Sequence, residues 1–432
     1  MNHLSRHQRL CLVAMSCVVM MDGFALADGI GTSQPTSMGP LAFEIRLDTV
    51  LKGFDGKSNW FGPRAAGVPA EARGGPTQVI LLQRAFLSAS DYFSGYSVLT
   101  SKDMGATWSA PREVPQLGWR EGPGGVVYGI SCFTPQWHAS TGKLLATGHS
   151  VRYVNGKLMS EPRPREVVYT VFDPKSGAWQ AWKTVNLPDR DKFFSAGAGA
   201  AQWLIEPDGS LLLPIYFKAR SSNPKACYSA TVLRCSFDGT TLKYLAHGDE
   251  LKLDVPRGFC EPSLAKVGGK YFLTLRNDEK GYAAASADGL HWSKPKPWTF
   301  DDRAELGSYN TQQHWATHGD GLFLVYTRRG ANNDHIMRNR APLFIAQVDP
   351  EKLRVIRPPN GSSCRSAEPP WAISAWRPSA TAKPGSPPPR RWPAGSSPNA
   401  ARPTPRSFLP EFSGLGPPHN QNPQRSLNHC HK

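Results

Sequence analysis

Short apolar runs recur along most of this chain, and turn-forming residues separate them. Between residues 43 and 357, almost no stretch shows the 3.6-residue periodicity of an amphipathic helix. The runs are short enough for strands, and Gly, Asp, Asn or Pro fills the gaps, as in Pro207-Asp208-Gly209. The pattern predicts strands at 77–82, 96–100, 167–172, 210–217, 271–275, 322–326 and 343–348. Many short strands joined by tight turns are typical of an all-β sandwich, barrel or propeller.

One turn sequence selects among these folds. Residues 101–108 read Ser-Lys-Asp-Met-Gly-Ala-Thr-Trp, which is the S-x-D-x-G-x-T-W pattern called the Asp box in sialidase-like propellers. In such a turn the Ser and Asp side chains bond the backbone, and Gly allows a positive φ. Residues 286–292 repeat the pattern one residue short, and weaker copies begin at 173 and 236. We therefore interpret Asp103 and Asp288 as turn-stabilising residues and not as catalytic ones.

The turn recurs at a spacing that suits a propeller blade. Copies begin at Ser101, Asp173, Ser236, Ser286 and Asp349, which are 50 to 72 residues apart. Four-stranded blades have repeats of about this length. Dividing the body of the chain by this spacing predicts a six-bladed β-propeller, with an incomplete last blade.

Several charged residues follow an order that resembles the exo-sialidases, six-bladed propellers that remove terminal sialic acids. In that family an early Phe-Arg-Ile-Pro segment carries the first of three arginines that bind the substrate carboxylate. The segment Phe61-Gly-Pro63-Arg64 is a looser form of it and places Arg64 at the matching position. The family's acid/base Asp lies shortly before the first Asp box, and Asp91 stands ten residues before Ser101.

The later residues keep the same order. Glu261 is followed fifteen residues later by Arg276, which resembles the family's Glu and second arginine. Arg340 opens an apolar run and fits the third arginine, and Arg338 is its rival for this place.

These residue types suit the cleavage of an acidic sugar. A sialoside carries its carboxylate on the anomeric carbon, so a carboxylate nucleophile would meet charge repulsion, and sialidases use a Tyr instead. Guanidinium groups bind carboxylates through charge-assisted, bidentate hydrogen bonds. The resemblance implies that Arg64, Arg276 and Arg340 hold the substrate carboxylate. It also implies that Asp91 protonates the leaving oxygen and that Glu261 accepts the proton of the Tyr hydroxyl.

Each of these residues also has a purely structural interpretation. Arg64 beside Pro63 could cap a strand end, and Asp91 could stabilise a turn. Glu261 could pair with Arg257 in a loop, and the other two arginines could be solvent-facing charges. Their joint order and spacing favour the functional interpretation.

The end of the chain departs from the family. A sialidase has its nucleophilic Tyr after the third arginine, whereas Tyr326 is the last tyrosine of this chain. Tyr282 and Tyr309 also stand out of order, so no nucleophile is assigned. Residues 358–432 hold 17 of the 39 prolines and only 2 Asp and Glu, a composition that predicts disorder. One hypothesis is that residues from about 358 onward are translated in another reading frame, which the gene's nucleotide sequence would test.

The N-terminus predicts export. Arg6 and Arg9 precede an apolar run, and Ala25 and Ala27 supply the small residues of a cleavage site. We expect a signal peptide at 1–27, the propeller at 28–357 and the tail at 358–432, with the mature protein secreted or periplasmic. No other stretch is long and apolar enough to predict a membrane span.

Charge, cysteine and histidine usage restrict the partners. The net charge of +16 divides into +7 in the tail, with 9 Lys and Arg against 2 Asp and Glu, and +9 before it. The basic residues lack the interleaved aromatics of a nucleic-acid surface, so nucleic acid is not expected. No CxxC or HExxH spacing is present, so neither a metal nor another cofactor is expected. Both disulfides and free thiols remain open for the body's cysteines: Cys132, Cys227, Cys235 and Cys260.

Three functions therefore remain open. The first is a secreted exo-glycosidase that hydrolyses terminal sialic acid or a related acidic sugar. The others are a non-catalytic carbohydrate-binding propeller and a glycosidase of different specificity. The expected partner is a sialylated or otherwise acidic glycan. Residues 195–200, 312–315 and 328–335 are further candidates to line its cleft.

Overall fold

The computed structural model describes residues 41–357, except for 42, 44, 46–47, 70–76, 222 and 224–226. The predicted signal peptide and C-terminal tail lie outside the described residues. The regular secondary structure of the described residues is almost entirely β-strand. Its helical segments are three 3-10 turns: η1 (Pro115–Leu117), η2 (Pro123–Gly125) and η3 (Met337–Asn339). No described helix is long and apolar enough to cross a membrane.

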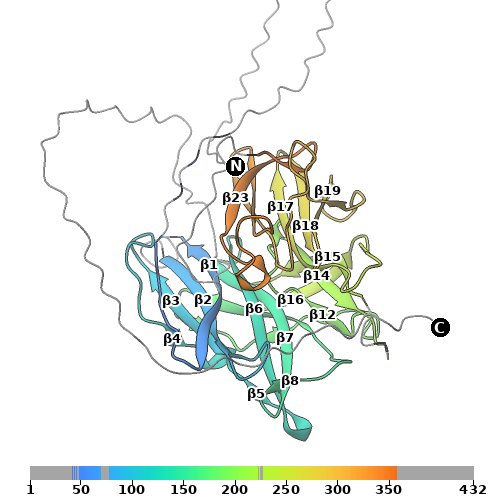
Figure 1. Ribbon diagram of the computed structural model, residues 1–432. Helices are drawn as coiled ribbons and strands as arrows, with labels where there is room; N and C mark the ends of the chain where they lie inside the picture. The colour runs from blue at the N-terminus through green and yellow to red at the C-terminus, as the bar shows by residue number, and fades with distance from the viewer. Residues whose placement is uncertain are drawn as a thin grey trace, which may run out of the picture. The chain divides into compact units, whose positions relative to one another are not determined.

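The described strands form five antiparallel sheets in a propeller-like arrangement, numbered in chain order (Figure 1). Sheet 1 contains β1 (Ser58–Val68), β2 (Thr77–Phe86), β3 (Phe93–Ser101) and β4 (Arg112–Glu113). Sheet 2 contains β5 (Arg120–Glu121), β6 (Val126–His138), β7 (Lys143–Val154), β8 (Lys157–Leu158), β9 (Val167–Asp173), β10 (Ala178–Trp179) and β11 (Lys183–Thr184). Sheet 3 contains β12 (Ser195–Gly197), β13 (Leu204–Ile205), β14 (Leu211–Lys218), β15 (Ser229–Phe237) and β16 (Leu242–His247).

The last two sheets are four-stranded meanders. Sheet 4 contains β17 (Cys260–Val267), β18 (Lys270–Arg276), β19 (Gly281–Ser286) and β20 (Lys296–Pro297). Sheet 5 contains β21 (His314–His318), β22 (Gly321–Tyr326), β23 (Phe344–Asp349) and β24 (Arg354–Val355). All seven strands predicted from the apolar runs are present, as parts of β2, β3, β9, β14, β18, β22 and β23.

The repeated turn occupies the same place in every sheet, between the last long strand and the short outer strand. In the first copy, Ser101 Oγ accepts the Gly105 N–H at 2.8 Å and donates to Asp103 Oδ1 at 2.7 Å. Gly105 has φ of 92°, which favours glycine. The Asp carboxylate of each copy accepts backbone N–H groups of its own turn, and these residues are Asp103, Asp173, Asp238, Asp288 and Asp349. Five turns therefore accompany five sheets.

The hydrophobic core lies between consecutive sheets. Separate clusters of buried side chains fill the four spaces between sheets 1 and 2, 2 and 3, 3 and 4, and 4 and 5. Their largest members include Phe133, Trp203, Phe259 and Trp298. Central strands such as β14, which reads Leu-Leu-Leu-Pro-Ile-Tyr-Phe-Lys, are buried on both faces because a sheet packs against each side.

Sheet 5 has a further apolar face, away from sheet 4. Phe323 and Val325 lie on this face and form a small cluster of their own. The Phe43 ring contacts Phe323 edge-on at 5.3 Å, and the Leu41 N–H donates to Gln347 Oε1 at 2.7 Å. The beginning of the described chain thus lies against its last sheet. A sixth sheet is not formed between residues 41 and 357, and residues from 358 onward lie outside the description.

Candidate active site

The first long strand of sheets 1, 2 and 4 is interrupted by a residue in the left-handed region. Gly62 in β1, Cys132 in β6 and Glu261 in β17 have φ of 58°, 57° and 46°. The ladder register shifts at the same places, between Phe61 and Arg64, between Ser131 and Thr134, and between Cys260 and Ser263. Such bulges redirect side chains. Strand β1 contacts β6, and β17 contacts both β14 and β21. Strands β7 and β12 connect β6 with β14, so the bulged strands belong to one continuous series of contacting strands.

Glu261 and Arg276 form the central ion pair of this region. Arg276 Nη1 donates to Glu261 Oε2 at 2.6 Å, and the two side chains are only 6% and 18% exposed. Cys260 pairs with Arg276 across β17 and β18, so this register places Glu261 beside the arginine. Burial raises the pKa of Glu261, but the charges of Arg276, Arg257 and Arg340 outweigh it and hold the pKa below its ordinary value. Glu261 is therefore an ionised carboxylate.

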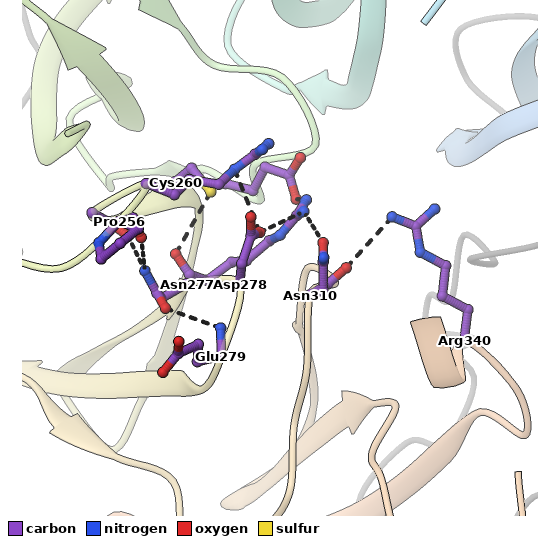
Figure 2. A network of polar contacts seen from close by, with 11 residues as sticks. Pro256, Cys260, Asn277, Asp278, Glu279, Asn310 and Arg340 are labelled. Atoms are coloured by element: carbon purple, nitrogen blue, oxygen red, sulfur yellow. Dashed lines mark hydrogen bonds and ion pairs between the residues drawn. The ribbon is translucent and has the colours of Figure 1, made fainter. Parts of the chain in front are cut away.

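Asn310 connects Arg276 with Arg340. Figure 2 shows Arg340 reaching toward Asn310. Arg276 Nη2 donates to Asn310 Oδ1 at 2.7 Å and forms an ion pair with Asp278 at 3.1 Å. Arg340 Nη2 donates to the Asn310 carbonyl at 3.4 Å. Arg340 is half-buried and Arg338 is exposed, so Arg340 is the arginine that faces the cluster.

Arg64 enters from sheet 1 and is 6% exposed. Its Nη2 lies 3.4 Å from His314 Nε2, and His314 Nδ1 lies 3.2 Å from Ser263 Oγ. Burial, together with the Arg64 charge, lowers the pKa of His314 well below its ordinary value. The neutral imidazole accepts a hydrogen bond from Arg64 at Nε2 and donates from Nδ1 to Ser263, a tautomer that follows from the neighbouring groups.

Asp91 lies in the turn between β2 and β3, exposed and with φ of 54°. Its charge acts on Arg340, and the charge of Glu261 acts on Arg64, Arg276 and Arg340. Electrostatic interactions therefore connect all five residues singled out in the sequence, with Glu261 acting on the three arginines and Asp91 on Arg340, although sheets 1, 4 and 5 supply them. Arg257, the alternative partner of Glu261, instead approaches Asp278 at 3.5 Å.

The three tyrosines considered as nucleophiles do not contact Glu261 in the described structure. Tyr326 is buried in β22 and stacks on Phe344. Tyr282 contacts Phe259, and Tyr309 lies under the Arg329 guanidinium at 3.7 Å. Among the described residues, no tyrosine hydroxyl donates a hydrogen bond to the Glu261 carboxylate, so the nucleophile is not assigned.

Sequence reasoning missed several residues near this cluster. Cys132 stands at the bulge of β6, where the charges of Glu261, Arg64 and Asp91 act on its thiol. Asn310 has φ of 42° and lies two residues before the 312–315 segment. That segment was predicted from the sequence as a candidate to line the cleft, whereas Asn310 itself was not. Cys132, Cys227, Cys235 and Cys260 are free thiols, which resolves the alternatives for the body's cysteines. The described residues contain no His, Cys, Asp and Glu group that could hold a metal.

This arrangement can bind a small anion. One of three guanidiniums, that of Arg276, forms an ion pair with Glu261, and those of Arg64 and Arg340, from other sheets, interact with this carboxylate through their charge. Charge-assisted hydrogen bonds are the strong ones in a partly buried site. Arg276 is already shared by Glu261, Asp278 and Asn310, whereas Arg340 contacts only a backbone carbonyl within the described residues. The carboxylate of a ligand would therefore compete with fewer protein groups for Arg340 than for Arg276.

Several solved structures of glycosidases are similar to this chain at low sequence identity. A Hadza microbial sialidase matches with a TM-score of 0.48 and 13% identity, over 67% of this chain and 56% of the other. Trypanosoma rangeli sialidase matches with a TM-score of 0.46 and 15% identity, over 68% of this chain and 47% of the other. A GH43 β-1,3-galactosidase matches with a TM-score of 0.44 and 13% identity, over 71% and 97%. The chain spans about half the length of the two sialidases. No family model and no curated protein matches it.

Proposed function

We propose that this chain is an exported glycoside hydrolase that removes a terminal sialic acid or a related acidic sugar from a glycan. Arg64, Arg276 and Arg340 bind the carboxylate of the sugar. Asp91 acts as the acid/base, and Glu261 accepts a proton from the nucleophile. The nucleophile itself is not assigned.

The observation that carries this proposal is the convergence of three arginines on Glu261. Arg64 comes from β1, Arg276 from the end of β18 and Arg340 from the segment after η3. A cluster of guanidiniums brought together from separate sheets suits recognition of a carboxylate, because guanidinium and carboxylate match in charge and in planar geometry.

The two carboxylates differ in surroundings as the two roles require. Asp91 is exposed in a turn and can reach a leaving oxygen that opens to solvent. Glu261 is largely buried, and its lowered pKa keeps it ionised and ready to accept a proton. In the free chain this carboxylate pairs with Arg276, so substrate binding at Arg276 would release part of that interaction.

A binding and turnover experiment tests the proposal. Full-length chain is titrated with 3′-sialyllactose by calorimetry and assayed on a fluorogenic sialoside. Arg340→Gln is expected to weaken sialyllactose binding roughly tenfold or more, because a charge-assisted contact is lost. Arg338→Gln is the matched control, since Arg338 is exposed two residues away, and we expect its affinity to stay within about twofold of wild type.

The outcomes separate the proposal from its alternatives. Turnover that Asp91→Ala abolishes supports the hydrolase, and equal loss in the Arg340 and Arg338 variants contradicts the assigned carboxylate site. Turnover of a uronide but not of a sialoside indicates an acidic sugar of another class.

A non-catalytic carbohydrate-binding propeller is the second candidate. It is favoured by the Glu261 carboxylate, which is paired with Arg276 and accepts no hydrogen bond from a tyrosine hydroxyl among the residues described between 41 and 357. Sialoside binding without turnover, unchanged by Asp91→Ala, would identify this function.

A further inference from the structure

A second cationic group lies beside the proposed active site, on sheets 2 and 3. Arg165 lies two residues before β9, and its guanidinium carbon lies 5.2 Å from the Tyr216 ring centroid and 5.7 Å from that of Tyr228. Lys218 Nζ lies 5.0 Å from the Tyr228 centroid. We call Arg165, Lys218, Tyr216, Tyr228 and His149 the Arg165 cluster.

Arg165 differs from its basic neighbours in its partners. Arg163 and Lys218 both form ion pairs with Glu161, at 3.0 and 3.1 Å. Within the described part of the chain, the Arg165 guanidinium has ring contacts but no carboxylate partner at ion-pair distance. Its charge is held in place by two aromatic faces and left available to an anion.

His149 supplies a second unsatisfied group. The side chain is only 8% exposed, and its Nδ1 has no hydrogen-bond partner among the described residues. Burial, together with the charges of Arg165 and Arg163, lowers the pKa of His149 well below its ordinary value, so the ring is neutral. A neutral imidazole can donate to, or accept from, a bound polar group.

Two glycines, Gly197 and Gly199, allow His149 and Arg165 to pack closely against the backbone of 195–200. A Cβ at Gly197 would lie 2.8 Å from His149 Cβ and 3.0 Å from Arg165 Cδ. A Cβ at Gly199 would lie 1.8 Å from His149 Nδ1 and 3.1 Å from Cys132 Cβ. The small residues of 195–200 thus leave the space that Arg165 and His149 occupy, next to the β6 bulge.

The Arg165 cluster adjoins the proposed active site, because the charges of both regions act on the same tyrosine. Burial raises the pKa of Tyr228, yet Arg165 and Lys218 outweigh it, and the pKa lies below its ordinary value. The pKa of Tyr216 lies above its ordinary value, chiefly because the side chain is buried. The charge of Arg165 lowers this pKa, and the charge of Glu261 raises it. One phenol is therefore within reach of both Arg165 and Glu261, so the Arg165 cluster adjoins the arginines that surround Glu261.

We propose that the Arg165 cluster is a subsite for a second anionic group of the glycan, a carboxylate or a sulfate ester. The inference rests on the proposed function, and it narrows the substrate to acidic glycans with two negative groups. One group binds at Arg64, Arg276 and Arg340, and the other binds at Arg165, with His149 available for a further hydrogen bond.

Calorimetry with three glycans tests this subsite. Full-length protein, carrying Asp91→Ala to prevent cleavage, is titrated with 3′-sialyllactose, α2,8-linked disialyllactose and sulfated sialyllactose. At least one dianionic glycan is expected to bind about tenfold more tightly than 3′-sialyllactose, which corresponds to about 1.4 kcal/mol. Preference for the disialyl compound assigns the anion to a second sugar acid, and preference for the sulfated compound assigns it to a sulfate ester.

Variants test whether Arg165 is the residue that causes the preference for dianionic glycans. Arg165→Gln should abolish the preference and leave 3′-sialyllactose affinity within about twofold, whereas Arg165→Lys should retain part of it. Arg120→Gln is the matched control, because Arg120 also stacks on an aromatic ring, at 3.7 Å from Trp182, and is expected to retain the preference. A thermal melt of each variant shows that it is folded.

The results that would contradict the subsite differ from those that would contradict the proposed function. If 3′-sialyllactose binds but the dianionic glycans bind no more tightly, the subsite is wrong and the proposed function stands. Equal loss of all three glycans in Arg165→Gln also overturns the subsite. If none of the three binds to the protein, both proposals are wrong.

Discussion

At the scale of single residues, Glu261 combines two features that a strand residue rarely has. Its φ of 46° lies in the left-handed region, and its carboxylate is largely removed from water. Both features cost free energy, and backbone strain of this kind persists at sites that the surrounding structure holds in place. The ion pair with Arg276 offsets the burial of both charges, because an unpaired charge at this depth would cost several kcal/mol.

Glu261→Gln tests the stabilising role of this pair. We expect the free energy of unfolding at pH 7 to fall by about 1–3 kcal/mol, since a charged hydrogen bond becomes a neutral one. The pKa of Glu261 lies below its ordinary value of 4.5, so the unfolded state binds more protons as the pH falls. The contribution is thus complete above pH 4.5 and is lost as the pH drops toward the folded-state pKa.

Urea denaturation at a series of pH values measures this effect. The difference between wild type and Glu261→Gln should narrow steadily below pH 4.5. Glu305→Gln removes an exposed pair with Lys280 and should change stability by no more than about 0.5 kcal/mol. A difference that stays constant down to pH 3 would contradict the role of the ionised carboxylate.

At the scale of elements, sheets 1, 2 and 4 carry their repeated turn and their left-handed bulge on different strands. The repeated turn connects the last long strand to the short outer strand, as in β3 to β4 and β19 to β20. The left-handed bulges lie in the first long strand of a sheet, which is β1 in sheet 1, β6 in sheet 2 and β17 in sheet 4. Loss of a turn should therefore affect folding without changing the residues that surround Glu261.

Ser101→Ala tests this separation. Ser101 is 2% exposed, and its hydroxyl bonds both the Gly105 N–H and Asp103. We expect a loss of about 1–3 kcal/mol in the free energy of unfolding, because a buried donor loses its acceptor. Sialyllactose affinity should not change.

Ser176→Ala is the control in the equivalent turn of sheet 2. Ser176 is exposed, and its hydroxyl makes only a 3.5 Å contact with the Asp173 carbonyl, so we expect stability to change by no more than about 0.5 kcal/mol. Loss of sialyllactose binding in a Ser101→Ala protein of unchanged stability would show that this turn belongs to the binding site.

At the scale of the whole molecule, a chain of hydrogen bonds links four sheets near their first strands. The Gln202 side chain, from sheet 3, bonds the backbone N–H and carbonyl of Trp315 in sheet 5, at 2.6 and 2.9 Å. The Gln202 N–H donates to Ser263 Oγ in sheet 4 at 3.2 Å. His314 continues this chain from Ser263 to Arg64 in sheet 1. The position of Arg64 therefore depends on contacts from three other sheets.

Gln202→Leu should affect stability and binding together. We expect a loss of about 1–3 kcal/mol for each buried backbone group of Trp315 that loses its partner. Sialyllactose affinity should fall as well, because the His314 ring that contacts Arg64 is no longer fixed. Gln78→Leu is the control, since the Gln78 side chain has only a 3.8 Å contact with Met104. Reduced stability with unchanged affinity would show that Arg64 does not depend on this network.

The candidate residues were predicted from the sequence only in part. The order of Arg64, Asp91, Glu261 and Arg276 along the chain was sufficient to select them. The choice between Arg338 and Arg340 depended on which side chain faces Asn310, a contact across 30 residues. Arg165 and His149 were not predicted, because their surroundings are built by residues distant in the chain.

Turns and strands are local, and the sequence by itself determined them. Apolar runs predict strands because both faces of a central strand are covered, and the Ser, Asp and Gly of each turn satisfy their own backbone. Dividing the body by the repeat spacing predicted six blades with the last one incomplete, and the five copies of the turn accompany the five described sheets. Only the tertiary structure decided which charges meet, because the left-handed bulges turn side chains from separate sheets toward one another. That convergence depends on the packing between sheets, which no single segment of the sequence specifies.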